Sequence, residues 1–293
     1  MPELPEVEIF RRFIDCHTLN ERIQAVTVRH PKGLRDLSPG ALERLCVQHR
    51  FTETLRRGKY LLAKLEPANA LSKSTPTVQA PWLLFHFGMT GCLSYTASTG
   101  HSINAYGDAI NRDAHSRVSF SLGNSGQLHF HDQRLFGYIS AIDHPEAFFE
   151  SKQLGPDALS ISQREFLARL QHKTGTLKPL LMNQAVLAGL GNIYVDELLF
   201  QCKLHPAQPV TQLPAVMLKH LHQEMQSILN NSIRLDTDRD ALPAHYLWHQ
   251  RHPKGHCPRD GHPFQIETVG GRTTYFCPHC QKLKRTERLK KSV

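Results

Sequence analysis

Pro2-Glu3-Leu4-Pro5-Glu6-Val7-Glu8 is the most informative stretch of this 293-residue chain, and it directly follows Met1. Met1 is normally removed before a residue as small as proline, which leaves Pro2 with a free secondary amine. An α-amino group titrates near ~7.7–8.0, so part of it is neutral and nucleophilic at physiological pH. A secondary amine that attacks a sugar C1′ gives an iminium ion, which favours elimination, and Glu3 could move protons beside it. The stretch therefore predicts a nucleophile at Pro2, unless Pro2 is an ordinary N-terminal residue.

The residues that follow predict a β-rich domain that one helix opens. Val7, Phe10 and Ile14 are spaced to lie on one face of a helix. Short apolar runs separated by turn residues then predict the strands of a sandwich or barrel. These runs lie at residues 23–28, 60–65, 82–87, 118–122 and 127–130. Residues 67–76 have no apolar period, so we expect a mobile loop there.

Two later changes in composition predict further domains. Helical spacing begins after Gly155 and continues from Ser162 to about Leu229, with a tight turn at residues 188–194. A short, polar, cysteine-bearing unit starts near His256 and is too small to build an apolar core of its own. We therefore expect an α+β protein with domains at residues 1–150, 151–250 and 251–293.

Composition and charge restrict the class of protein. Hydrophobic residues make up 40% of the chain and charged residues 21%, and no stretch approaches the ~20 apolar residues that span a bilayer. The acidic, proline-bearing N-terminus is unlike a secretory signal, so we expect a cytoplasmic protein. The net charge of +9 favours a polyanionic partner, although charge alone does not separate nucleic-acid binders from other basic proteins.

Two glycine-bearing segments carry side chains suited to a gap in a DNA duplex. The first is Gly88-Met89-Thr90-Gly91, which His86 precedes, and the second is Asp132-Gln133-Arg134-Leu135-Phe136-Gly137. An enzyme that flips a base out of DNA must fill the space that the base leaves. Apolar wedges such as Met89 and Phe136 suit that space, and an arginine can hydrogen-bond the widowed base. The alternative is that Met89 and Phe136 are core residues beside turns.

A second glycine-rich turn, Gly189-Leu190-Gly191-Asn192, precedes a predicted helix. Backbone N–H groups at a helix N-terminus bind phosphate, and Asn192 adds a side-chain donor. The alternative is a helix cap without a ligand, because asparagine is also a good N-cap.

Cysteines near the C-terminus have the spacing of zinc knuckles. Cys257-Pro258-Arg259-Asp260 and Cys277-Pro278-His279-Cys280 would bind a tetrahedral zinc ion. Asp260 stands where a second thiolate is expected; a carboxylate is an acceptable zinc ligand, and His262 is a nearby competitor. A metal-free hairpin of the same shape is the remaining alternative. Arg272 lies near the predicted tip of the hairpin between the knuckles.

Taken together, these motifs closely resemble those of the formamidopyrimidine-DNA glycosylase and endonuclease VIII family, from Pro2 to about Lys284. The resemblance implies an N-terminal β-sandwich domain, a helix–two-turn–helix domain and a C-terminal β-hairpin zinc finger. It further implies a bifunctional DNA glycosylase and AP lyase of base excision repair. Such an enzyme acts on double-stranded DNA with oxidised bases or abasic sites, through a Schiff base on Pro2 and then β,δ-elimination. A non-catalytic damaged-DNA-binding protein of the same fold is the alternative, and the intact Pro2-Glu3 pair argues against it.

The resemblance also implies roles for individual residues. The catalytic residues would be Pro2 as the Schiff-base nucleophile, Glu3 as the proton donor and acceptor, and Lys59 as a phosphate ligand at the lesion. The expected DNA contacts are Glu6, His86, Met89, Arg134, Phe136, Asn192 and Arg272. The expected ligands of a structural Zn²⁺ are Cys257, Asp260, Cys277 and Cys280.

Several positions depart from the family's pattern. Leu135 replaces a basic residue, Asp260 replaces a cysteine, and residues 67–81 look like an insertion. The segment at residues 235–245 is short. One branch of the family has a longer loop at this place, and that loop covers 8-oxoguanine. The lesion therefore stays open among formamidopyrimidines, 8-oxoguanine and oxidised pyrimidines. We expect a monomer that works in the cytoplasm at a bacterial-type nucleoid, without a membrane.

Overall fold

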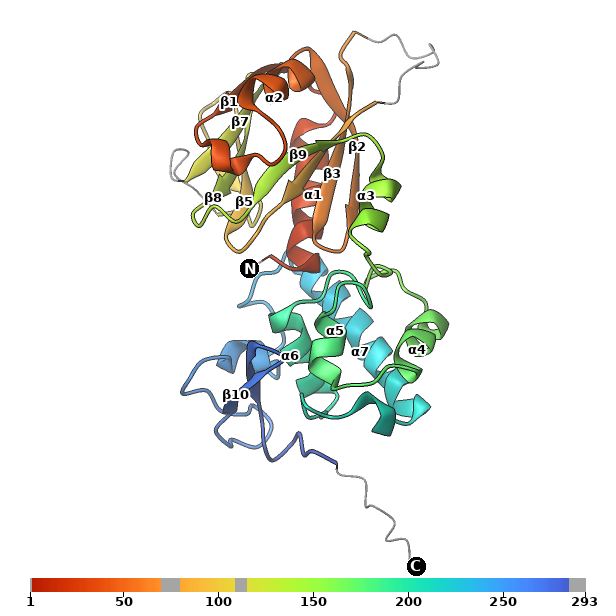
Figure 1. Ribbon diagram of the computed structural model, residues 1–293. Coiled ribbons are helices and arrows are strands. Elements are labelled where there is room, and N and C mark those ends of the chain that lie inside the picture. The colour runs from red at the N-terminus through yellow and green to blue at the C-terminus, as the bar shows by residue number, and fades with distance from the viewer. Residues whose placement is uncertain (1, 70–79, 109–114, 285–293) are drawn as a thin grey trace, which may run out of the picture. The chain divides into compact units, whose positions relative to one another are not determined.

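Residues 2–69, 80–108 and 115–284 are described by a computed structural model of the chain (Figure 1). The chain divides into two units, Met1–Gln153 and Leu154–Val293. Most of the loop predicted at residues 67–81 lies outside the described residues. Among the helices that are described, none is both long and apolar enough to cross a membrane.

Two antiparallel sheets form the N-terminal unit, one of five strands in the order β1-β7-β8-β5-β6 and one of four in the order β2-β3-β4-β9. The five-stranded sheet consists of β1 Ile23–Val28, β5 Gly91–Thr96, β6 Ser102–Asn104, β7 Ser116–Leu122 and β8 Gln127–Asp132. The four-stranded sheet consists of β2 His49–Arg57, β3 Tyr60–Pro67, β4 Trp82–His86 and β9 Tyr138–Ile142.

Apolar side chains of both sheets meet in one core. Phe51 and Phe85 of the four-stranded sheet contact Phe120 of the five-stranded sheet, with ring centroids 5.9 and 6.5 Å apart. All three rings are fully buried. Two separate sheets that pack face to face form a sandwich, so the predicted β-sandwich is confirmed and the barrel is excluded.

Helix α1, Leu4–Thr18, completes this core (Figure 1). Val7, Phe10 and Ile14 are fully buried, as their spacing predicts. The ring of Phe10 lies 4.4 Å from that of Phe87, the residue directly after β4. The remaining helices of the unit are η1 Pro31–Gly33, α2 Pro39–Cys46 and α3 Pro145–Ser151.

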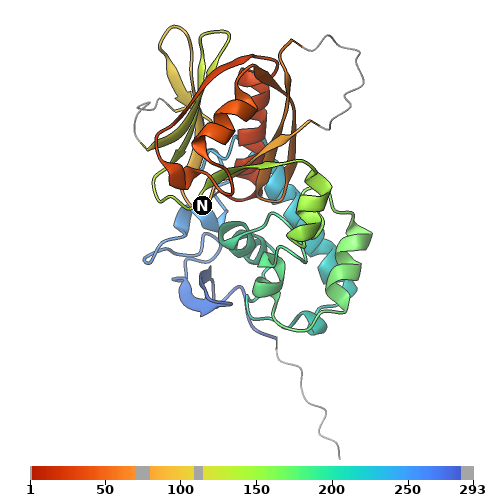
Figure 2. The same cartoon turned by 45° about the horizontal axis from the view of Figure 1, so that its top comes forward.

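The C-terminal unit is helical and ends in a β-hairpin (Figures 1 and 2). Its elements are α4 Gln163–Gln171, α5 Leu177–Met182, α6 Asn192–Gln201, η2 Val210–Gln212, α7 Ala215–Arg234, η3 Leu247–Gln250, β10 Gln265–Val269 and β11 Arg272–Phe276. Gly189 has φ 115°, a conformation open to glycine, in the turn before α6. Gly270 and Gly271 have φ 59° and 74°, the pattern of a two-residue hairpin turn. The predicted helical region and hairpin are both present.

Candidate functional site

The N-terminal stretch begins α1 and holds two carboxylates at its first turn. Pro2 and Glu3 are buried, and no part of Glu3 is exposed to solvent. The carboxylate of Glu6 accepts a hydrogen bond of 2.9 Å from the backbone N–H of Glu3, as in a capping box. The nitrogen of Pro2 therefore lies just before the positive end of a helix dipole, which disfavours a protonated amine there.

A buried ion pair joins α1 to the turn that carries Lys59. Arg56 donates to Glu8 at 2.9 Å and to the carbonyl of Gly58 at 3.1 Å. Burial raises the pKa of Glu8, but hydrogen bonds from Arg11 and Arg56 outweigh it, so the pKa lies below its usual value. The charged pair fixes the Gly58-Lys59 turn against α1, the helix that directly follows the candidate nucleophile Pro2 and Glu3.

Met89 and Phe136 are exposed on the N-terminal unit. Their exposed fractions are 40% and 53%, whereas most large apolar side chains of the unit are buried. These values exclude the alternative that both are core residues. Leu135, beside Phe136, has φ 57°, which a residue with a side chain rarely adopts. The arrangement presents apolar side chains to solvent from two short turns.

One buried carboxylate connects these two turns. Asp132 is 1% exposed. Its Oδ1 accepts from the hydroxyl of Thr90 at 2.5 Å and from the backbone N–H of Arg134 at 3.2 Å. Its Oδ2 accepts from the backbone N–H of Gly137 at 2.6 Å. The backbone carbonyl of Asp132 accepts from Arg117 at 2.7 Å. Asp132 therefore holds the turn after Met89 and the turn around Phe136 together.

We expect Asp132→Asn to loosen both turns at once. An amide cannot accept all of these hydrogen bonds, and a buried donor left unpaired costs about 1–3 kcal/mol. Hydrogen exchange should therefore accelerate in residues 88–91 and 133–137 together, with a matching loss in the free energy of unfolding. Thr90→Val, which removes only the hydroxyl, is the milder control. Faster exchange in one turn alone would contradict the connection.

His86 supports the same region as a neutral ring. It stacks on Tyr138 with centroids 5.1 Å apart, and its Nδ1 accepts from the backbone N–H of Gly88 at 3.3 Å. Burial, with the nearby charges of Arg35 and Lys59, lowers the pKa of His86 to about 4. At neutral pH the ring is uncharged, so any contact that it makes with DNA is a hydrogen bond and not a charge pair.

In the C-terminal unit, Asn192 and Arg272 lie on neighbouring elements. Asn192 begins α6 and donates to the carbonyl of Thr273 at 3.0 Å. Arg272 is the exposed first residue of β11, directly before Thr273. The start of α6 and the tip of the hairpin thus carry the two predicted phosphate ligands of this unit side by side.

A fully buried ion pair lies beneath this junction. The Nζ of Lys178 donates to Asp196 at 2.6 Å and to the hydroxyl of Thr274 at 2.7 Å. Arg251 donates to the other oxygen of Asp196 at 2.8 Å. The side chains of Lys178 and Asp196 are 0% exposed. These charges connect α5, α6, η3 and the hairpin.

Glu197, next on α6, is a buried acid that orders the segment before the hairpin. It accepts from the backbone N–H groups of Leu247 and Trp248 at 3.3 and 3.0 Å, and from the amide of Gln201 at 2.6 Å. Burial raises the pKa of Glu197 to about 7 against these hydrogen bonds. The role is structural within this unit.

The residues that support the candidate site in each unit were not predicted from the sequence. Asp132 lies two residues before Arg134, and aspartate accepting the N–H two residues on is a known turn signal. Lys178 and Asp196 are 18 positions apart on different helices, and no local pattern connects them. Only the first of these could have been found from the sequence.

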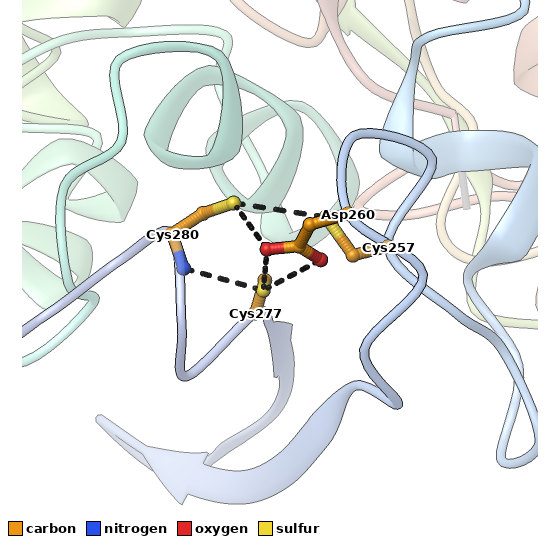
Figure 3. A group of neighbouring side chains, drawn as sticks. All are labelled: Cys257, Asp260, Cys277 and Cys280. Atoms are coloured by element: carbon orange, nitrogen blue, oxygen red, sulfur yellow. Dashed lines mark hydrogen bonds between the residues drawn. The ribbon is translucent and has the colours of Figure 1, made fainter.

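Four side chains near the C-terminus form a compact group (Figure 3). The ligand atoms of Cys257, Asp260, Cys277 and Cys280 all lie within 4.8 Å of one another. Cys257 and Cys280 have their sulfurs 3.8 Å apart, and Cys277 lies 3.7 Å from each oxygen of Asp260. Ligands at ~2.3 Å from a tetrahedral zinc ion lie about 3.8 Å apart, so the group fits zinc. The structure places Asp260, and not His262, among the thiols.

Three family models match the chain. Residues 1–139 match the formamidopyrimidine-DNA glycosylase N-terminal domain, and residues 154–241 match the formamidopyrimidine-DNA glycosylase H2TH domain. Residues 257–283 match a zinc finger found in FPG and IleRS. Together with the cluster of Cys257, Asp260, Cys277 and Cys280, the zinc-finger match supports a structural zinc ion in this chain.

Curated relatives match over nearly the full length. The formamidopyrimidine-DNA glycosylase of Pelotomaculum thermopropionicum is 33% identical, over 97% of this chain and 100% of that protein. The Arabidopsis thaliana protein of the same name is 30% identical, over 97% of this chain and 71% of its own length.

Solved structures of formamidopyrimidine-DNA glycosylase also match this chain over nearly its full length. The Lactococcus lactis formamidopyrimidine-DNA glycosylase, non-covalently bound to DNA with an AP site, is 28% identical with a TM-score of 0.78, covering 96% of this chain and 99% of that one. The Lactococcus lactis enzyme with DNA that contains an oxidised pyrimidine is 27% identical with a TM-score of 0.79, covering 96% and 100%. These matches, on the sandwich, helices and zinc group described above, show that the chain belongs to the formamidopyrimidine-DNA glycosylase family.

Proposed function

We propose that this protein is a DNA glycosylase of base excision repair with AP lyase activity, and that Pro2 is its nucleophile. The observation that carries the proposal is the placement of Pro2 and the buried Glu3 at the start of α1 in a chain that matches the family over nearly its whole length. The substrate class is double-stranded DNA with oxidised bases or abasic sites.

The first step uses the secondary amine that removal of Met1 exposes. Its lone pair forms a bond with C1′ of an extruded nucleotide, the bond from C1′ to the damaged base breaks, and the base leaves with the electron pair and takes up a proton. The amine then loses its own proton, and its lone pair forms the C1′=N⁺ double bond as the bond from C1′ to the ring oxygen breaks. That oxygen takes up a proton and becomes a hydroxyl, which leaves the opened sugar as an iminium ion. The positive end of α1 favours the neutral, reactive amine. Glu3, fully buried beside Pro2, is the group that donates and accepts protons.

The second step uses the iminium ion as an electron sink. It acidifies the 2′ proton, so loss of that proton expels the 3′ phosphate by β-elimination, and δ-elimination then expels the 5′ phosphate. Lys59, Asn192 and Arg272 are the proposed phosphate ligands. Contacts of this kind release counterions, so binding should weaken steeply as salt rises.

Met89, Arg134 and Phe136 are the side chains that we propose to enter the duplex. Their exposure on two connected turns supports this role, since a wedge must be free of the protein core. His86 and Glu6 complete the proposed DNA contacts, with His86 acting as a neutral ring.

We assign Cys257, Asp260, Cys277 and Cys280 to one structural zinc ion. A first domain at residues 1–150 would carry Pro2 and Lys59, a second at residues 151–250 would carry Asn192, and a third at residues 251–293 would carry this finger with Arg272. The site of action would be the cytoplasm, on the DNA of the nucleoid.

Borohydride trapping tests the proposed function. Wild-type protein incubated with abasic duplex and borohydride should form a covalent adduct, because the reductant fixes the Schiff base between Pro2 and the sugar. Intact duplex of the same sequence is the control. A protein that binds the abasic duplex but gives no adduct would be the non-catalytic damage binder instead. A panel of duplexes with formamidopyrimidine, 8-oxoguanine or an oxidised pyrimidine then identifies the preferred lesion.

A further inference from the structure

The carboxylate in the proposed zinc group has partners that a thiolate would not need. The Oδ2 of Asp260 lies 3.0 Å from the sulfur of Cys280 and accepts from Nδ1 of His279 at 2.8 Å. Its Oδ1 accepts from the backbone N–H of His262 at 3.1 Å and lies 3.4 Å from Nδ1 of that residue. Both oxygens therefore face an imidazole as well as the thiols.

Two exposed imidazoles next to Asp260 stack on each other. The rings of His262 and His279 stack with centroids 4.4 Å apart and an interplanar angle of 17°. Their side chains are 51% and 55% exposed, so burial does not hold them in place. Both rings contact Asp260, whose carboxylate lies next to Nδ1 of each ring. His262 follows the first knuckle, residues 257–260, and His279 lies within the second, residues 277–280.

A carboxylate is a more demanding ligand than a thiolate in such a site. It is harder and has two oxygens, so it can rotate between binding modes, and its orientation depends on hydrogen bonds from outside the ligand set. Removal of such an outer hydrogen bond commonly weakens metal binding about 10–100-fold. In this chain the group in place to provide it is the Nδ1–H of His279.

We propose that His279, stacked on His262, is a positioning residue that holds Asp260 as the fourth zinc ligand. The carboxylate and the imidazole together do the work of the missing thiolate. The inference rests on the ligand set proposed above, and it does not depend on the glycosylase chemistry. It predicts a dependence on His279 that disappears when residue 260 is a cysteine.

A double-mutant cycle on the full-length protein tests this, with the zinc Kd measured by competition against a chelator. His279→Ala should raise the Kd about 10–100-fold. Asp260→Cys should lower it, because a fourth thiolate suits zinc and needs no orienting partner. In the Asp260→Cys background, His279→Ala should leave the Kd unchanged. His252→Ala, an exposed histidine of the same unit outside the group, is the matched control.

Cobalt substitution gives a second readout. Co²⁺ absorption reports the number of thiolates, so it should change in Asp260→Cys and keep its three-thiolate character in His279→Ala. Three results would overturn the inference. His279→Ala could bind zinc like the wild type; it could lose affinity equally in both backgrounds, which indicates a structural role for the ring; or it could lose more than Asp260→Asn, which makes His279 a ligand itself.

Discussion

Pro2→Gly should lose base excision by about 100-fold or more, which corresponds to ~2.7 kcal/mol of transition-state stabilisation. Glycine leaves a primary amine at the same position, and Met1 is removed before glycine as it is before proline. A primary amine gives a neutral imine that must take up a proton before it draws electrons, whereas the secondary amine of Pro2 gives the charged iminium directly. The variant therefore isolates the chemistry of the nucleophile.

Two measurements accompany this prediction. Binding of Pro2→Gly to duplex with a stable abasic-site analogue should equal that of the wild type, because the phosphate ligands and wedges are intact. Mass spectrometry of both proteins should show that Met1 is absent. Cleavage by Pro2→Gly at the wild-type rate, with its N-terminus verified, would rule out Pro2 as the nucleophile.

Lys178→Met should destabilise the C-terminal unit by about 3–5 kcal/mol, because it leaves the buried charge of Asp196 without one of its partners. The side chains of Lys178 and Asp196 are 0% exposed, so water cannot take the place of the ammonium. The same change removes the bond from Lys178 to the hydroxyl of Thr274, which itself donates to the carbonyl of Arg272 at the hairpin tip. Denaturant unfolding, followed by a probe in this unit, measures the loss.

A surface pair in the same unit provides the control. Arg169 and Glu165 form an ion pair of 3.3 Å with side chains 39% and 46% exposed. Exposed pairs of this kind contribute about 0–1 kcal/mol, so Arg169→Met should change stability little. Equal effects of Lys178→Met and Arg169→Met would show that the buried network does not support the fold.

Local patterns identified α1, the helical region of the C-terminal unit, several strands and the zinc knuckles, because each depends on neighbours in sequence. They missed α2 and α3 of the N-terminal unit. Strands β2, β5, β6 and β9 were missed. In β5 the polar residues Ser94 and Thr96 are buried, where they contact His131 and His129 at 2.7 and 3.2 Å. A strand is recognised in a sequence when its buried positions are apolar and its exposed positions are polar. In β5 two buried positions are polar, because hydrogen bonds to the neighbouring strand satisfy them, so the expected pattern is absent.

The candidate site shows the same limit. Asp260 and His262 lie two positions apart in one turn, so spacing alone left both open as ligands, and the structure places Asp260 among the thiols. Met89 and Phe136 could be core or surface residues from their sequence, and their exposure decides between the two. Lys178 and Asp196 come into contact only in the folded chain, so no local sequence motif predicts their ion pair.

The backbone at Leu135 has a consequence for the proposed wedge Phe136 beside it. A residue with a side chain at φ 57° costs about 1–2 kcal/mol, and folding meets this cost through the bonds that Asp132 makes on either side. Hydrogen bonds within the protein thus set the backbone around the proposed wedge Phe136, so binding of DNA should cost little ordering entropy in this turn. In the proposed role, Phe136 would therefore enter the duplex from a preformed turn, and no loop would have to fold first.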